Sequence, residues 1–225
     1  MCGRFQLSVK GKQISERFNI EVFDELYTPS YNCVPSQKLP VITNKQPDRL
    51  SYFNWGLIPF WTKNPKVGAK SINTRSETIS QKPSFKEAFK KQRCLIPANG
   101  YYEWKKGNSN TPYRIFIKDE RIFTIAGIWD VWKDAENREI YTFSIITTKA
   151  NSILENIHGR MPVILNPDDE KSWLQEDDEV RLKSLLKPYS SSFFDFYPIS
   201  KAINSPKNNN PNVIIKNDDG QLLLF

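Results

Sequence analysis

Short apolar runs separated by polar turns dominate the sequence and predict a protein built mainly from β-strands. Runs rich in β-branched and aromatic residues are typical of strands. A polar turn at 44–48 separates the first two runs, and Asp119-Glu120 forms the turn between two later ones. We expect strands at 41–43, 50–55, 94–97, 101–104, 113–117, 122–129, 141–147 and 162–165.

Helical patterns lie between and after these runs. Residues 13–25 have apolar positions at amphipathic spacing. Ser84 is a good N-cap with Glu87 as its capping-box partner, which predicts a helix ending near Lys91. Further helices are expected at 151–157, 168–175 and 178–186, and acidic residues occupy the first turn of the last two.

The C-terminal end differs from the rest of the chain. Residues 204–212 contain five Asn and two Pro, a composition typical of irregular structure. The apolar segments 213–215 and 222–225 could still dock on the body of the protein. Without repeats or a clear linker, residues 1–225 are expected to form a single α+β domain with an irregular tail at about 204–225. Its sheet should be mostly antiparallel and barrel-like, with peripheral helices.

Composition excludes several classes of protein. Hydrophobic residues make up 39% of the chain and aromatic residues 13%, which supports a packed core and excludes global disorder. No run approaches the about 20 apolar residues of a transmembrane helix, and polar residues interrupt the N-terminus where a signal peptide would be apolar. We therefore expect a cytoplasmic protein with no membrane partner, and we also expect a monomer.

Charge and metal-ligating residues narrow the choice of partners. The net charge of +7 favours a polyanion such as nucleic acid, although many basic proteins bind none. Three cysteines without a CxxC pair predict neither a disulfide framework nor a structural zinc site. Cys33 and Cys94 lie in apolar settings and are expected to be buried and inert. A single histidine, His158, excludes a multi-histidine metal site, and we expect no metal and no cofactor.

The chemically distinctive position is Cys2. An initiator Met followed by a small residue is usually removed, which would leave Cys2 as the first residue. Its α-amine would have a pKa of about 8 and be partly uncharged at neutral pH. A neutral amine attacks an aldehyde to give a Schiff base, and the adjacent thiol can then close a thiazolidine ring. The alternative is that Cys2 is an inert residue at a loose chain end.

Three further segments carry polar groups that could act with Cys2: 73–77, 99–104 and 158–162. Glu103 lies between Tyr102 and Trp104, so in a strand it faces away from both. In a dry pocket its pKa would rise and suit proton transfer, whereas in solvent it would be an ordinary carboxylate. His158 is either an ordinary surface residue or a proton-transfer group, because its unperturbed pKa is close to neutral pH.

Arginines and tryptophans near these segments suggest nucleic-acid contacts. Arg4, Arg75 and Arg160 each lie within two residues of a candidate catalytic position, and Arg binds phosphate bidentately. Trp61 and Trp104 could stack on bases if they are exposed. The alternatives are surface salt bridges for the arginines and core packing for the tryptophans.

Together these segments resemble the SRAP family, which is named for an SOS-response-associated peptidase and includes abasic-site sensor proteins of bacteria and animals. The resemblance covers about residues 2–205 in family order, and it departs from the family in the Asn-rich run beyond Asn208. The matching stretches are Cys2-Gly3-Arg4-Phe5, Tyr31-Asn32 with Pro35, Trp55-Gly56-Leu57-Ile58-Pro59, Asn73-Thr74-Arg75-Ser76-Glu77-Thr78, Arg93-Cys94-Leu95-Ile96-Pro97-Ala98-Asn99-Gly100-Tyr101-Tyr102-Glu103-Trp104, Ala126-Gly127-Ile128-Trp129, Thr147-Thr148 and His158-Gly159-Arg160-Met161-Pro162.

The resemblance implies the SRAP fold and a protein that binds single-stranded DNA containing an abasic site. Such proteins link covalently to the site and protect it from strand cleavage. The family nucleophile matches Cys2, its acid/base residue Glu103, its histidine His158 and its pocket asparagine Asn73. His158 would favour opening of the sugar ring, Glu103 would relay protons, and Asn73 would orient the sugar or the chain terminus.

The family's DNA-backbone arginines match Arg75 and Arg160, with Arg4 a weaker match. Two other functions stay open on the sequence. The family name implies an N-terminal-nucleophile cysteine peptidase or autoprotease, in which the amine of Cys2 would activate its own thiol. A non-covalent binder of single-stranded nucleic acid would use only the basic surface and the aromatic residues.

Overall fold

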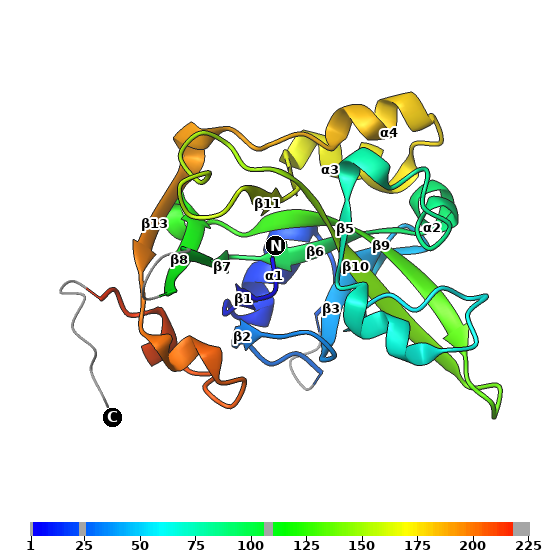
Figure 1. Ribbon diagram of the computed structural model, residues 1–225, viewed down its shortest axis with the longest axis horizontal. Coiled ribbons are helices and arrows are strands. Elements are labelled where there is room, and N and C mark those ends of the chain that lie inside the picture. Colours follow the sequence, from blue (N-terminus) through cyan, green and yellow to red (C-terminus); the bar gives the residue numbers. More distant parts are fainter. Residues whose placement is uncertain (1, 23–25, 106–109, 218–225) are drawn as a thin grey trace.

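The computed structural model describes residues 2–22, 26–105 and 110–217. Five of its strands close a barrel (Figure 1). Strand β10 pairs in parallel with β4 and antiparallel with β9, and antiparallel pairing continues from β9 through β6 and β3 back to β4. The barrel strands are β3 (Lys38–Thr43), β4 (Gln46–Trp55), β6 (Arg93–Ala98), β9 (Phe123–Lys133) and β10 (Glu139–Lys149).

Three short strands extend the barrel. β5 (Asn73–Arg75) runs parallel to β10, and β11 (Arg160–Pro162) pairs antiparallel with the same strand. β12 (Ile164–Leu165) pairs with β9. Two segments that are far apart in the sequence therefore pair with the C-terminal end of β10. Both contain candidate site residues.

A second sheet of five antiparallel strands covers one side of the barrel. Its order is β13-β8-β7-β1-β2. The expected α+β class with a mostly antiparallel, barrel-like sheet and peripheral helices is confirmed. The strands are β1 (Phe5–Leu7), β2 (Ser30–Cys33), β7 (Gly100–Lys105), β8 (Thr111–Ile117) and β13 (Phe194–Pro198).

A turn forms at Asp119-Glu120 between β8 and β9, as predicted, but these two strands do not pair with each other. β8 pairs with β7 and β13, whereas β9 pairs with β6, β10 and β12. Asp119 has φ 67°, inside the 3₁₀ turn Lys118–Glu120. This left-handed residue redirects the chain from the outer sheet into the barrel.

The helices lie outside the barrel, and α3 and α4 sit together on one side of it (Figure 1). None of the helices among the described residues has the length and apolarity to cross a membrane. The α-helices are α1 (Gly11–Phe18), α2 (Lys86–Lys91), α3 (Pro167–Gln175) and α4 (Glu179–Leu185). The 3₁₀ turns are η1 (Pro65–Lys70), η2 (Ser76–Thr78), η3 (Lys118–Glu120), η4 (Ser191–Phe193), η5 (Lys201–Asn204) and η6 (Pro211–Ile214).

Three helix predictions need correction. The helix expected at 13–25 ends at Phe18, because Asn19 takes a left-handed conformation and its N–H caps the carbonyl of Ser15; residues 23–25 lie outside the described part of the chain. α2 starts at Lys86 without a side-chain cap, so the capping box expected at Ser84 does not form. Residues 151–157 form consecutive turns instead of a helix, and the Asn151 side chain accepts from the Leu154 N–H at 3.2 Å.

The Asn-rich tail is anchored by hydrogen bonds. Asn209 Oδ1 accepts from the backbone N–H groups of Tyr31 at 2.7 Å and Asn32 at 3.0 Å. In return, Asn32 Nδ2 donates to the carbonyl oxygens of Ile203, Ser205 and Asn208. Val213 is buried in a small cluster with Tyr102 and Ile203. The other segment expected to dock, 222–225, lies outside the described residues.

Arg93 connects the barrel to two of its helices from a fully buried position, 1% exposed. Its guanidinium donates to backbone carbonyls at the end of α2 and along and after α3. Helix ends leave such carbonyls without partners, so a single side chain satisfies several groups that would otherwise be costly to bury.

The substitution Arg93→Met should therefore lower the free energy of unfolding by about 3 kcal/mol, because it leaves buried carbonyls unpaired. Urea denaturation at neutral pH would measure the loss. Arg49→Met, at an exposed position on β4, is the matched control and should change stability by less than about 0.5 kcal/mol. Equal losses in the two variants would contradict this role.

Candidate functional site

Cys2 does not lie at a loose chain end. It is fully buried in the core cluster that also holds Phe5 and Trp55. β1 is fixed against β7 by the pairing of Phe5 with Tyr101 and by a hydrogen bond from Tyr102 N to Arg4 O at 3.0 Å. The Cys2 thiol itself donates to Arg4 O at 3.7 Å. The structure thus holds the predicted nucleophile against the strand that carries Glu103.

Asn73 connects Cys2 to the barrel. β5 places Asn73 opposite Ile145 of β10, and Asn73 Nδ2 donates to the carbonyl oxygen of Cys2 at 2.8 Å. The other amide atom, Oδ1, is buried and has no hydrogen-bond partner among the described residues. One half of the amide therefore fixes the main chain of Cys2, and the other half is available to a ligand.

Glu103 supplies the titratable group of this pocket. It is 4% exposed on β7, and burial raises its pKa from the ordinary 4.5 to about 7. Burial, followed by the charge of Glu103, also raises the pKa of the Cys2 thiol. At neutral pH the thiol is therefore protonated, while Glu103 can both accept and return a proton. The strand alternation expected from the sequence is present, because the Tyr102 hydroxyl bonds Gln6 and Tyr31 on the other face.

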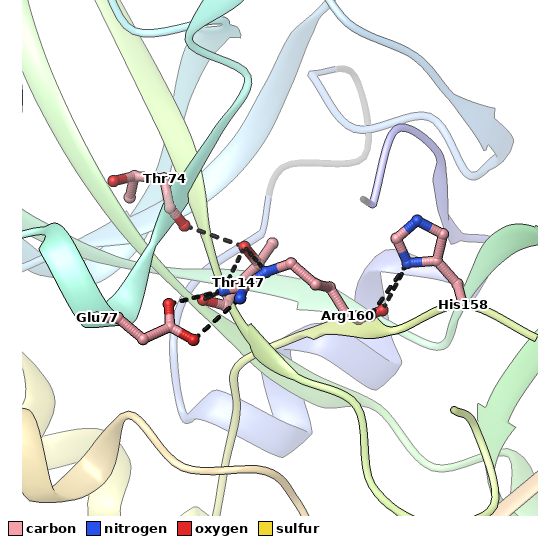
Figure 2. Close-up of polar contacts among 5 residues, drawn as sticks. All are labelled: Thr74, Glu77, Thr147, His158 and Arg160. Atoms are coloured by element: carbon pink, nitrogen blue, oxygen red, sulfur yellow. Dashed lines mark hydrogen bonds and ion pairs between the residues drawn. The ribbon is translucent and has the colours of Figure 1, made fainter. Parts of the chain in front are cut away.

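Arg160 opens β11, which pairs with the end of β10, and His158 lies two residues before it (Figure 2). The backbone N–H of Arg160 donates to His158 Nδ1 at 3.1 Å, which fixes the imidazole. The guanidinium points away from His158 and binds both carboxylate oxygens of Glu77 at 2.9 Å. It also donates to the carbonyl of Thr147 at 2.6 Å. The hydrogen bonds from Arg160 lower the pKa of Glu77.

The predicted DNA-contact residues divide into two groups. Arg75 is exposed, and Trp61 is 55% exposed beside Phe60, so these side chains face solvent. Arg4 and Trp104 are instead only partly exposed, and their polar groups bond other parts of the protein. The Arg4 guanidinium donates to Asn32 Oδ1 and to Asn204 O at 2.7 Å each, and Trp104 Nε1 donates to Asn204 Oδ1 at 2.9 Å.

Several residues of the site were missing from the sequence-based set. Glu77 and Thr147 orient Arg160, and Asn204 orients Arg4 and Trp104. Glu77 and Thr147 belong to stretches that match the family, but nothing in the sequence indicated which neighbours they contact. Within the described part of the chain, no group of three or more His, Cys, Asp or Glu residues is placed to hold a metal ion.

Comparison with known proteins agrees with the family resemblance seen in the sequence motifs. The profile of the family described as SOS response associated peptidase (SRAP) matches residues 1–206. The abasic site processing protein YoqW of Bacillus subtilis (strain 168) is 46% identical over 221 residues, which cover 95% of this chain and 99% of that protein. The abasic site processing protein HMCES of Xenopus tropicalis is 34% identical over 219 residues, which cover 82% of this chain and 65% of that protein.

Solved structures share the fold. A protein from Bacteroides thetaiotaomicron superimposes with a TM-score of 0.89 at 34% identity, covering 96% of this chain and 100% of that one. A protein from Bordetella bronchiseptica gives a TM-score of 0.74 at 26% identity and covers 88% of this chain and 100% of that one. The barrel with its covering sheet is therefore a shared architecture.

The raised pKa of Glu103 predicts a pH-dependent stability. Because the folded protein binds this proton more tightly than the unfolded chain does, stability should fall as the pH rises from 4.5 to about 7. Glu103→Gln has no proton to lose, so at about pH 8 it should be more stable than the wild type by up to about 3 kcal/mol, with little difference at about pH 5.

Urea denaturation at both pH values would test this expectation. Glu155→Gln, a change at an exposed carboxyl, is the control and should show no such pH-dependent gain. A Glu103→Gln protein that is equally destabilised at both pH values would show that Glu103 is not a buried carboxyl of raised pKa.

Proposed function

Because the chain belongs to the SOS response associated peptidase (SRAP) family, we propose that it is an abasic-site sensor that binds single-stranded DNA and forms a thiazolidine crosslink through Cys2. The relatives named abasic site processing proteins support the choice of lesion. The observation that carries the proposal is the hydrogen bond from Asn73 to the Cys2 carbonyl, which holds the reactive end beside a carboxyl whose pKa is about 7.

The chemistry follows from the groups in the pocket. Once Met1 is removed, the neutral amine of Cys2 adds to C1′ of the open-chain abasic aldehyde. Glu103 gives a proton to the carbinolamine hydroxyl, which leaves as water, and a protonated Schiff base remains. The Cys2 thiol then adds to the same carbon and closes the ring. A thiazolidine has no C=N bond to promote β-elimination, so the DNA strand beside the lesion is protected.

Asn73 and His158 prepare the substrate in this scheme. The Oδ1 of Asn73, which no described residue bonds, can accept from a sugar hydroxyl, and His158 moves the proton that opens the sugar ring. Exposed Arg75 and Trp61 are placed to meet a phosphate and a base, and Arg160 adds a second cation. The net charge of +7 suits this partner. We place the protein in the cytoplasm, associated with damaged DNA as part of the DNA-damage response and acting as a monomer.

A cysteine peptidase is the second candidate, because the family is named for that activity. A peptidase needs a thiolate nucleophile. Here burial and the neighbouring Glu103 raise the pKa of the Cys2 thiol, which opposes thiolate formation. Attack by the amine does not need a thiolate, so the electrostatics of the pocket favour the Schiff-base route.

The adduct itself provides the direct test. Wild-type protein whose intact mass shows loss of Met1 should form an adduct with an abasic single-stranded oligonucleotide that survives denaturation. Cys2→Ala should form no adduct of that stability, because it lacks the thiol that closes the ring. Cys2→Ser should form at most a less stable linkage of the Schiff-base type. Gel electrophoresis after denaturation measures all three.

An oligonucleotide without an abasic site and a peptide pool test the two other candidate functions, non-covalent binding and peptidase activity. Binding to both oligonucleotides without any adduct would favour non-covalent recognition, and turnover of the peptides would favour the peptidase. A Cys2→Ala adduct as stable as that of the wild type would exclude the thiazolidine.

The rate of adduct formation should depend on the ionisation of Glu103. In single-turnover reactions between about pH 5 and 9, the wild-type rate should change slope at a pH of about 7, where Glu103 titrates. Glu103→Gln should be slower by on the order of 100-fold and should lose this inflection, whereas Glu155→Gln should keep it. An inflection at about 7 that persists in Glu103→Gln would assign it to another group.

A further inference from the structure

Tyr101 is a buried residue of β7 to which the proposed mechanism gives no role. Its side chain is 1% exposed and belongs to the same core cluster as Cys2. Its hydroxyl is buried and has no hydrogen-bond partner among the described residues. The next residue, Tyr102, is equally buried, but its hydroxyl donates to Gln6 Oε1 at 3.0 Å and to Tyr31 O at 2.7 Å.

An unpartnered buried hydroxyl opposes folding, because the hydroxyl gives up its hydrogen bonds to water and gains none in return. Phenylalanine would fill the same space without this cost. A residue that weakens the fold in this way is expected where function requires it.

The position of Tyr101 indicates what that function is. Tyr101 and Glu103 are two residues apart on β7, so their side chains leave the same face of the strand. Tyr101 also pairs directly with Phe5, three residues after Cys2. Burial, then the charge of Glu103 and then that of Cys2, raise the pKa of Tyr101 far above its ordinary value. Its hydroxyl therefore keeps its proton and can donate a hydrogen bond to an acceptor.

We propose that Tyr101 is a further catalytic residue, whose hydroxyl donates a hydrogen bond to the Cys2 sulfur as the thiol adds to the Schiff base. This inference rests on the proposed function. In this step the S–H bond breaks and its proton passes to the Glu103 carboxylate. A sulfur lone pair forms the S–C1′ bond, and the π pair of the protonated C=N bond moves to the nitrogen, which keeps its proton and ends as the neutral N–H of the ring amine.

Charge balance explains why the sulfur needs a donor. The carboxylate of Glu103 becomes neutral as it takes the proton, while negative charge develops on a sulfur that is fully buried. A donor that forms its hydrogen bond only at this stage stabilises the transition state without stabilising the ground state. The hydroxyl of Tyr101 meets this condition, because no described residue already occupies it.

The test compares Tyr101→Phe with Tyr102→Phe in protein that has lost Met1. Reactions with an abasic single-stranded oligonucleotide are stopped over time either with borohydride, which captures the Schiff base, or by denaturation alone, which leaves the ring adduct. Tyr101→Phe should form the Schiff base at the wild-type rate but close the ring at least about tenfold more slowly, so that the reducible species accumulates. Its thermal midpoint should equal or exceed that of the wild type.

Tyr102→Phe should show the opposite pattern. It loses two hydrogen bonds and should melt at a lower temperature, while both chemical steps keep their rates. In a Cys2→Ala background, Tyr101→Phe should have no effect on Schiff-base formation, because the thiol is absent.

Ring closure at the wild-type rate in Tyr101→Phe would overturn the inference, and so would a lower thermal midpoint with both chemical steps slowed together. A wild-type protein that forms neither species would instead reject the proposed function itself. The two failures are therefore distinct.

Discussion

The hydrogen bond between Asn73 and the carbonyl of Cys2 is the contact on which the candidate site depends. It joins β5, which is attached to the barrel, to the first residues of the covering sheet. It adds a contact with the barrel to the pairing of β1 with β7 and β2 and to the hydrogen bonds of Arg4. Chain ends are usually loose, and a reactive terminus gains effective concentration only when it is fixed. The closed barrel matters for function because β10 supports Asn73, His158 and Arg160 from a single strand.

In the proposed function, burial determines which atom of Cys2 attacks first. A fully buried thiol beside Glu103 has a raised pKa, and this opposes the ionised sulfur that a peptidase would use. The same burial raises the pKa of Glu103 to about 7, which suits proton transfer at neutral pH. The pocket also contains an amide oxygen on Asn73 and a hydroxyl on Tyr101 that have no hydrogen-bond partner among the described residues. These features oppose folding, and such conflicts are expected where a protein gives up stability for chemistry.

Local patterns in the sequence predict the five barrel strands and β7 and β8, but they miss β1, β2, β5 and β13 and do not indicate which strands pair. Alternation placed Glu103 on the face opposite Tyr102, and that face is confirmed by the Tyr102 hydrogen bonds. Barrel closure depends on β10 pairing with both β4 and β9, and no short pattern contains that information. Periodicity also missed the end of α1, which a left-handed Asn19 sets. The motifs predicted candidate residues of the site, but the hydrogen bonds from Arg160 to Glu77 and from Arg4 to Asn204 join segments that are distant in the sequence.

The hydrogen bonds that Arg4 and Arg160 make with distant segments decide which of the two arginines can bind DNA. Arg4 already donates to Asn32 and to Asn204, so a phosphate would have to replace two short internal hydrogen bonds. Arg160 pairs with Glu77, whose side chain is 43% exposed, and ion pairs that face water contribute only about 0–1 kcal/mol. A phosphate can therefore displace Glu77 more readily than it can displace the tail. In the proposed function, Arg75 and Arg160 would hold the DNA backbone, while Arg4 would brace the segment that carries Cys2.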